Sequence, residues 1–170
     1  MGKEEKINIE KGFEELSGIV KQAPVAMMAT NLLKIPFSIC PMTTVQVAPE
    51  GALWFFSDKE SEHYKHIADD SQVQLLYSND EDQRYVSVYG KAEISNDQEL
   101  MDKLWDPGLS AWFDGKDDPG LVLIKVVIES AYFWDADEKR VLPLIEGAGV
   151  ISPNKESVSD NRGTIKFQNH

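Results

Sequence analysis

Three short stretches decide the fold of this chain: CPMTT at residues 40–44, LWFFS at 53–57 and SEHYK at 61–65. The first two have the composition of neighbouring strands, and the third that of a helix start. The first turn of a helix carries unpaired N–H groups and a partial positive charge, so it suits an anion such as a phosphate. The strands could hold a planar, hydrogen-bonding ring beside it. The same residues would also suit an ordinary packed sheet edge, because patterning alone does not specify function.

The remaining pattern predicts many strands and few helices. Apolar residues at helical spacing predict an amphipathic helix over about 8–22, which Pro24 would end. We expect two short helices, one capped by Ser57 or Asp58 and one over 96–105. Strands are predicted at 25–30, 37–47, 52–57, 73–77, 84–94, 121–128 and 131–134, with a bulge at Gly90.

Six or so strands with little helix are typical of a small closed or split β-barrel, so the expected fold class is mainly β (α+β). The 170 residues are enough for one domain with a substantial core, and no linker divides them. We therefore expect a single domain over 1–151 and a polar tail over 152–170. The tail should be mobile unless Ile165 and Phe167 dock on a neighbour.

Charge and hydropathy argue against two classes of partner. The chain has 17 Lys and Arg against 29 Asp and Glu, and its net charge of −12 repels nucleic acid and anionic membrane surfaces. The richest apolar run, 121–128, is interrupted by Lys125 and is too short to span a bilayer. Because the N-terminal residues are charged rather than apolar, we expect an unexported, cytoplasmic protein.

Few residues suggest chemistry of their own. Cys40 is the single cysteine, and with the three histidines it forms no credible metal set. As a strand cysteine without an adjacent cation, Cys40 is expected to be an inert apolar residue. We find no Gly-x-Ser-x-Gly elbow and no nucleophile paired with a base. Any catalysis would then come from a bound cofactor, which the protein positions.

A longer set of motifs extends the three stretches. They are PMTT at 41–44, GxLWFFS at 51–57, Ser61, VxLxYS at 73–78, RYVSVxGxAEI at 84–94, LWxP at 104–107, AWF at 111–113, GKDDP at 115–119 and SAxxWD at 130–135. In this order they resemble the pyridoxamine 5′-phosphate oxidase-like proteins, and most of all their bacterial general stress protein subfamily. The resemblance covers about 25–135. It implies a six-stranded split β-barrel with flanking short helices, a homodimer and bound flavin mononucleotide (FMN).

The resemblance also implies which residues hold the cofactor. Main-chain amides and hydroxyls of the PMTT strand would bond the polar edge of the flavin ring, while the methionine contacts its apolar body. The neighbouring strand and the helix start would reach the ribityl chain and phosphate, and a tryptophan would lie near the ring across the dimer interface. The implied residues are Met42, Thr43, Thr44, Phe56, Ser57, Ser61, His63, Lys65 and Trp112. Ordinary strand packing, or a tryptophan that anchors its own turn, is the alternative.

The chain departs from the family pattern at the phosphate end. Family members usually carry Arg where Cys40 stands and Lys where His63 stands, so two permanent cations are missing. A phosphate brings about −1.5 to −2 charges at neutral pH. Ser61, Lys65 and Arg84 are the other polar candidates nearby in sequence. We therefore expect weaker flavin binding than in a typical relative, or a site that has been lost or repurposed.

Three functions follow from these observations. The first is a homodimeric, FMN-binding general stress-type protein, with or without a weak oxidoreductase activity toward an unidentified partner. The second is a non-enzymatic split-barrel module with weakened or lost FMN affinity, which Cys40 and His63 favour. The third is pyridoxamine 5′-phosphate oxidation. That reaction needs a second phosphate site, and the chain has no surplus basic cluster to supply one.

Overall fold

Alternation of buried and exposed side chains makes the central segments of the chain into strands. The computed structural model describes residues 2–135, 144–146, 149–151 and 162–166. In β4 (Gln72–Asn79), for example, Val73, Leu75 and Tyr77 are buried, whereas Leu76 and Ser78 are exposed. The other strands of the barrel are β1 (Val25–Thr30), β2 (Ser38–Ala48), β3 (Ala52–Asp58), β5 (Arg84–Ser95) and β6 (Leu121–Asp135).

These six strands form a closed antiparallel barrel, as the sequence predicted. Their order is β3-β2-β1-β4-β5-β6, and an additional pairing of β3 with β6 closes the sheet on itself. The two expected strands at 121–128 and 131–134 are one continuous strand, β6, because its pairing with β5 runs through a single register shift. Side chains from all six strands fill the interior, among them Met28, Phe55, Leu75 and Phe133.

Pairing between β2 and β3 is incomplete, and this is where the barrel is split. The two strands pair from Ala48↔Ala52 to Thr44↔Phe55, with an irregularity between Thr44 and Gln46. Beyond that point residues 38–43 of β2 pair only with β1, while residues 56–58 of β3 pair only with β6. The two strand ends therefore leave a gap in the hydrogen-bonded wall of the barrel.

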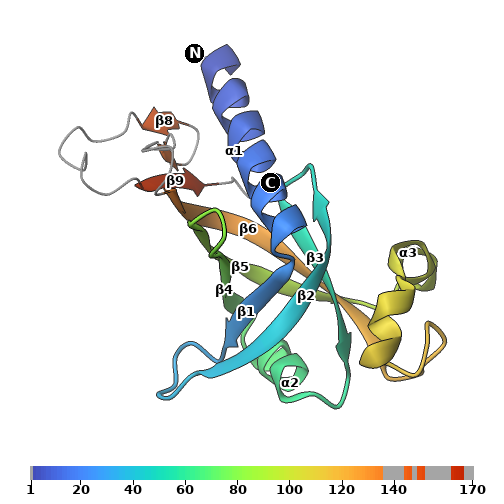
Figure 1. Ribbon diagram of the computed structural model, residues 1–170. Helices are drawn as coiled ribbons and strands as arrows, with labels where there is room; N and C mark the ends of the chain where they lie inside the picture. The colour runs from blue at the N-terminus through green and yellow to red at the C-terminus, as the bar shows by residue number, and fades with distance from the viewer. Residues whose placement is uncertain (1, 136–143, 147–148, 152–161, 167–170) are drawn as a thin grey trace.

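Helices lie at the ends and on one side of the barrel. Figure 1 shows α1 (Gly2–Gln22) and α2 (Glu62–Asp69) at opposite ends, with α3 (Gln98–Leu104) beside the barrel. α1 begins earlier than the expected start near residue 8. α3 lies within the expected range 96–105 and is capped by Asp97, whereas the cap of α2 is Ser61, not Ser57 or Asp58. The chain needs one turn after β3 before the helix begins.

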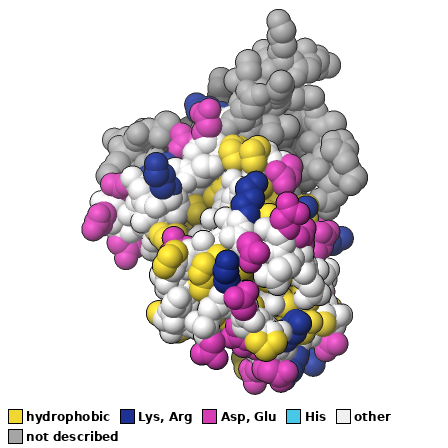
Figure 2. Space-filling view, turned by 90° about the vertical axis from the view of Figure 1, so that its right-hand side faces the viewer, with side chains coloured by type: hydrophobic (Ala, Val, Ile, Leu, Met, Phe, Trp, Pro, Cys, Tyr) yellow, Lys and Arg dark blue, Asp and Glu magenta, His cyan; other side chains and the backbone are white. Residues whose placement is uncertain are grey.

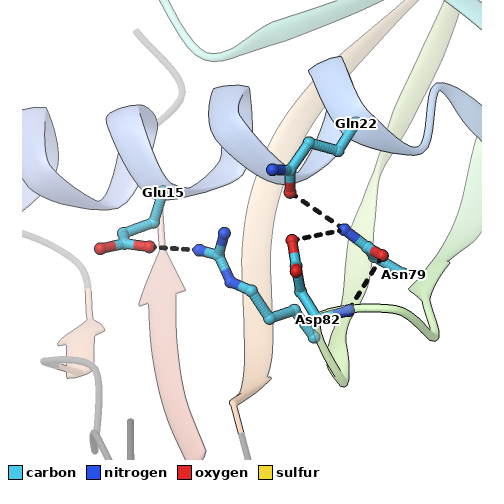
Figure 3. A network of polar contacts seen from close by, with 5 residues as sticks. Glu15, Gln22, Asn79 and Asp82 are labelled. Carbon is cyan, nitrogen blue, oxygen red and sulfur yellow. Dashed lines mark hydrogen bonds and ion pairs between the residues drawn. The ribbon is translucent and has the colours of Figure 1, made fainter. Parts of the chain in front are cut away.

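A polar network fastens α1 to the turn between β4 and β5 (Figure 3). Asn79 Nδ2 donates to Gln22 Oε1 at 2.9 Å and to Asp82 Oδ2 at 3.1 Å. Beside it, Arg84 forms an ion pair with Glu15 of α1. Arg84 is therefore committed to the α1 end of the barrel, although its position in the sequence had suggested the phosphate end of the cofactor site.

A second hydrophobic cluster lies outside the barrel, between β3 and the segment after α3. Phe56 packs edge-on against Trp105, with ring centroids 5.7 Å apart. The ring centroid of Phe113 lies 6.5 Å from that of Phe56. Leu109, in the 3₁₀ helix η1 (Pro107–Ala111), is buried in this cluster. The cluster fixes η1 and residues 112–113 next to the end of β3.

The C-terminal region contributes three short strands, β7 (Leu144–Glu146), β8 (Gly149–Ile151) and β9 (Arg162–Lys166). β9 pairs with β6 over residues 130–134, so this part of the expected mobile tail is a strand. Phe167 and residues 152–161 lie outside the described part of the chain. Neither α1 nor any other helix of the described residues combines the length and apolar composition needed to cross a bilayer. On the face drawn in Figure 2, acidic side chains are spread among basic and hydrophobic ones.

Gly90 lies at the register shift between β5 and β6. Tyr89 pairs with Ser130 and Gly90 with Ile128, so the extra residue of the predicted bulge is Glu129, on the opposite strand. A Cβ at Gly90 would lie 2.3 Å from the carbonyl oxygen of Val127, which is backbone and cannot move aside easily.

We predict that Gly90→Ala lowers the free energy of unfolding by about 1–3 kcal/mol or more, because the added methyl group forces two paired strands apart. Gly18→Ala is the matched control. A Cβ at Gly18 has no neighbour within 4 Å, so in helix α1 it should stabilise by roughly 0.5–1 kcal/mol. Urea unfolding midpoints measure both changes. A Gly90→Ala midpoint at or above that of wild type would contradict the assigned register.

Candidate functional site

A cavity occupies the split between β2 and β3. It has a volume of about 280 Å³ and is lined by Val25, Cys40, Pro41, Met42, Thr43, Phe56, Ser57, Asp58, His63, Leu109, Trp112 and Phe113. This volume is near the lower end of small-molecule sites, which begin at about 300 Å³. Most of the lining side chains are apolar or aromatic, so the cavity suits the flat apolar body of a ligand. Trp112 is 78% exposed at its rim.

The unpaired part of β2 supplies main-chain groups to this cavity. In an antiparallel sheet alternate residues direct their N–H and C=O groups to each side of the strand. Since residues 40–43 pair only with β1, the groups on their other side have no β3 partner. Pro41 has no N–H, so the donors of this segment come from its neighbours. Such groups can bond the polar edge of a ring that enters the split.

Strand alternation separates the two predicted threonines. Thr43 is exposed and lines the cavity, whereas Thr44 is buried inside the barrel. There the Thr44 hydroxyl lies 2.7 Å from the hydroxyl of Tyr77 on β4. Burial raises the pKa of Tyr77 far above its usual range, and the Thr44 hydrogen bond offsets this in part. The Thr44 side chain therefore packs inside the barrel and does not line the cavity.

A cluster of two hydroxyls and an imidazole forms the polar end of the cavity. Ser57, at the end of β3, is only 2% exposed. Its Oγ lies 2.7 Å from Nε2 of His63, in the first turn of α2. The Oγ of Ser61, the cap of that helix, lies 3.2 Å from the same Nε2 and 3.3 Å from Ser57 Oγ. The cluster thus joins the end of one strand to the start of one helix.

Hydrogen-bond directions indicate where the His63 proton lies. Ser61 Oγ donates to the carbonyl oxygen of Asp58 at 2.6 Å and accepts from the N–H of Tyr64 at 3.3 Å. Its proton is used, so its contact with His63 is favourable only if Nε2 carries a hydrogen. Ser57 Oγ can then accept a hydrogen bond from the same Nε2–H, and its own hydroxyl proton stays available for a different acceptor.

The hydrogen bonds of Ser61 favour a donor Nε2 on His63 over a serine–histidine pair with an unprotonated Nε2. A histidine acting as base toward Ser57 needs an unprotonated Nε2, with its Nδ1–H oriented by a third group. Among the described residues, none forms a hydrogen bond with His63 Nδ1. Sequence analysis found no nucleophile paired with a base, and the proximity of Ser57 and His63 is better explained as a hydrogen-bonding cluster.

Electrostatics at the cavity are unusual for an anion site. The ionisable groups among the lining residues are the side chains of Cys40, Asp58 and His63, and neither lysine nor arginine is among them. Burial lowers the pKa of His63; the neighbouring His66 lowers it further, and Asp58 opposes the change. Burial also raises the pKa of the Cys40 thiol, which makes it a poor nucleophile at neutral pH.

Of the nine residues expected from the resemblance, the cavity brings together Met42, Thr43, Phe56, Ser57, His63 and Trp112. Ser61 contacts His63 but is not part of the cavity lining. Thr44 points into the barrel, and Lys65 is exposed on α2 and is not part of the lining. Sequence analysis did not assign Val25, Pro41, Asp58, Leu109 or Phe113 to the site. For Phe113 a signal existed, because it belongs to the AWF motif at 111–113.

The described residues contain no group of three or more His, Cys, Asp or Glu side chains arranged to hold a metal ion. The features of the site that can bind a ligand are its cavity, its main-chain groups and the Ser57–His63–Ser61 cluster.

The chain is similar in sequence to known proteins. Residues 11–155 match the profile of the family described as pyridoxamine 5′-phosphate oxidase like. General stress protein 26 of Bacillus subtilis (strain 168) is 38% identical over 91 residues, a match that covers 52% of this chain and 65% of that protein.

Two solved structures show the same fold. The general stress protein 26 of Bacillus anthracis str. Sterne superposes with a TM-score of 0.63 at 24% identity, covering 71% of this chain and 92% of that one. The general stress FMN/FAD binding protein of Xanthomonas citri gives 0.62 at 24% identity, with 76% and 89% covered. Because the family profile spans most of the sequence, the chain belongs to the pyridoxamine 5′-phosphate oxidase-like family.

Proposed function

We propose that this protein binds FMN in the split between β2 and β3, as a homodimeric, cytoplasmic protein of the general stress type. The main support for the proposal is the cavity, which has apolar lining residues at one end and the Ser57–His63–Ser61 cluster at the other. The Xanthomonas citri relative, an FMN/FAD binding protein, supports a flavin as the ligand.

The lining residues fit the two ends of such a cofactor. Met42, Phe56 and Trp112 would contact the ring, and main-chain groups of residues 40–43 would bond its polar edge. The Ser57 hydroxyl and the unpaired N–H groups at the start of α2 would receive the phosphate, which a helix N-terminus favours. When bound, a flavin supplies hydride or single-electron transfer. The protein's part is to position the ring and shield it from water.

A non-enzymatic module with weakened FMN affinity is the second candidate. The observation that favours it is the absence of lysine and arginine among the described residues that line the cavity. The same observation argues against pyridoxamine 5′-phosphate oxidase activity, because a phosphorylated substrate would need a second anion site. An oxidoreductase activity on an unidentified partner remains part of the first proposal only.

Exposed apolar side chains on the outer face of the barrel support the proposed homodimer. The register places Pro41, Met27 and Leu76 side by side across β2, β1 and β4. On β5 and β6, Tyr85, Tyr132 and Trp134 continue this face, and the last two stack with ring centroids 6.3 Å apart. Contiguous exposed apolar patches of this kind mark protein interfaces.

We predict that FMN binds more tightly than riboflavin, because only FMN has a phosphate for the Ser57 hydroxyl and the start of α2. A hydrogen bond to a charged phosphate contributes about 1.5–3 kcal/mol, so the preference should be on the order of tenfold or more. Quenching of flavin fluorescence during titration measures both affinities. Ser57→Ala should reduce the preference, and Lys65→Ala, which changes an exposed side chain outside the lining, should preserve it. Equal affinities in wild type would show that the phosphate contact is absent.

We predict a dimer in solution at micromolar concentration, since burial of the outer apolar face stabilises association. Sedimentation should give about twice the 19.1 kDa mass of the chain. Leu76→Glu should shift the equilibrium to monomer, because it places a charge on that face. Gln98→Glu adds the same charge on exposed α3 and should leave the dimer intact. A wild-type protein that sediments only as a 19.1 kDa species would contradict the proposal.

A further inference from the structure

We propose that His63 is the specificity-determining residue for the anionic end of the ligand, and that it becomes the cation of the site by taking up a proton when a phosphate binds. The inference rests on the proposed function, because it concerns the phosphate of FMN in the same cavity. It adds that ligand binding and proton uptake are one coupled equilibrium.

The described residues that line the cavity include neither lysine nor arginine to balance a phosphate. A bound phosphate brings about −1.5 to −2 charges, and burying that charge without a partner is costly. Among the described residues around the cavity, His63 is the one side chain that gains a positive charge by protonation. Lys65 is exposed and outside the lining, and Arg84 is paired with Glu15 at the other end of the barrel.

The imidazole of His63 is held through one of its two nitrogens. Nε2 is engaged by Ser57 and Ser61 at 2.7 and 3.2 Å. Ser61 in turn is held by the Asp58 carbonyl and the Tyr64 N–H. A second proton must therefore go on Nδ1, for which the described residues provide no hydrogen-bond partner. The ring can become cationic without breaking the contacts that hold it.

The groups around His63 determine whether ligand binding takes up or releases a proton. Its titratable neighbours are Asp58 at the end of β3, Cys40 on β2 and His66 on α2. Leu109, Trp112 and Phe113, which line the same cavity from the segment after α3, carry no titratable group. Burial and His66 outweigh Asp58 and keep the pKa of His63 below its usual value. In the free protein the ring is therefore neutral near pH 7.

A bound phosphate reverses this balance, because a nearby opposite charge favours the charged form of the imidazole. Between the pKa of the free protein and the higher pKa of the complex, each binding event takes up a proton, and affinity rises as pH falls. Protonation of the phosphate itself near pH 6 opposes the trend. The linkage is therefore measured most cleanly at about pH 7, where the phosphate is mostly dianionic.

Isothermal titration calorimetry in two buffers of different ionisation enthalpy measures this linkage directly. At about pH 7 wild type should take up a measurable fraction of a proton per FMN, and riboflavin binding should take up none. His63→Lys carries a permanent cation, so it should bind FMN without proton uptake and about ten- to hundredfold more tightly than wild type at about pH 8. His63→Gln keeps a neutral donor and should also show no uptake.

Lys65→Ala is the control, and it should leave proton uptake unchanged because Lys65 is outside the cavity lining. Urea midpoints close to that of wild type verify that each variant is folded. FMN binding without proton uptake, or a His63→Lys variant no tighter than wild type at about pH 8, would overturn the role of His63 and leave flavin binding in place. If wild type and His63→Lys both fail to bind FMN and riboflavin, the proposed function and this inference fail together.

Discussion

Separation of β2 from β3 beyond the Thr44↔Phe55 pair is the constraint on which the rest of the site depends. Main-chain groups along the unpaired strand edges need hydrogen-bond partners, which water or a ligand in the cavity can supply. Here the opening is bounded by side chains that are themselves well packed. Phe56 belongs to the outer cluster with Trp105 and Phe113, while Met42 belongs to the barrel core.

Each neighbouring element is positioned by this opening and by local chemistry. Once β3 leaves β2, it pairs with β6 as far as Asp58, and a turn with Asp58 Oδ1 accepting from the Glu60 N–H leads to the cap of α2. The same Ser61 hydroxyl that caps the helix contacts His63. A contact made for helix capping therefore also orients the imidazole toward the cavity. Stability and ligand recognition share one set of hydrogen bonds at this point.

Much of the fold could be predicted from the sequence because strand alternation and turn residues are local signals. The barrel, the short helix within 96–105 and the place of the bulge at Gly90 follow from such signals. Side-chain direction was harder to predict, since a change of one residue reverses the face of a strand. Thr43 and Thr44 have the same chemistry, yet only Thr43 lines the cavity.

Contacts between distant residues explain the other differences. Arg84 lies close to the site in sequence motifs but pairs with Glu15, 69 positions away. Leu109 and Phe113 reach the cavity because the outer cluster folds η1 against β3. Lys65 is exposed on α2 and is not part of the cavity lining. Proximity in sequence did not predict any of these three outcomes.

Hydrogen exchange of individual amides, measured with and without FMN, tests most directly whether the split holds the ligand. The account predicts slower exchange for the amide of Thr43, which faces away from β1 and would bond the ring. It also predicts slower exchange for Glu62 and His63 at the start of α2, which would bond the phosphate. Riboflavin should protect the Thr43 amide and not those of Glu62 and His63. The Tyr64 amide, already bonded to Ser61, should change little. Unchanged exchange of the Thr43 amide with saturating FMN would contradict the account.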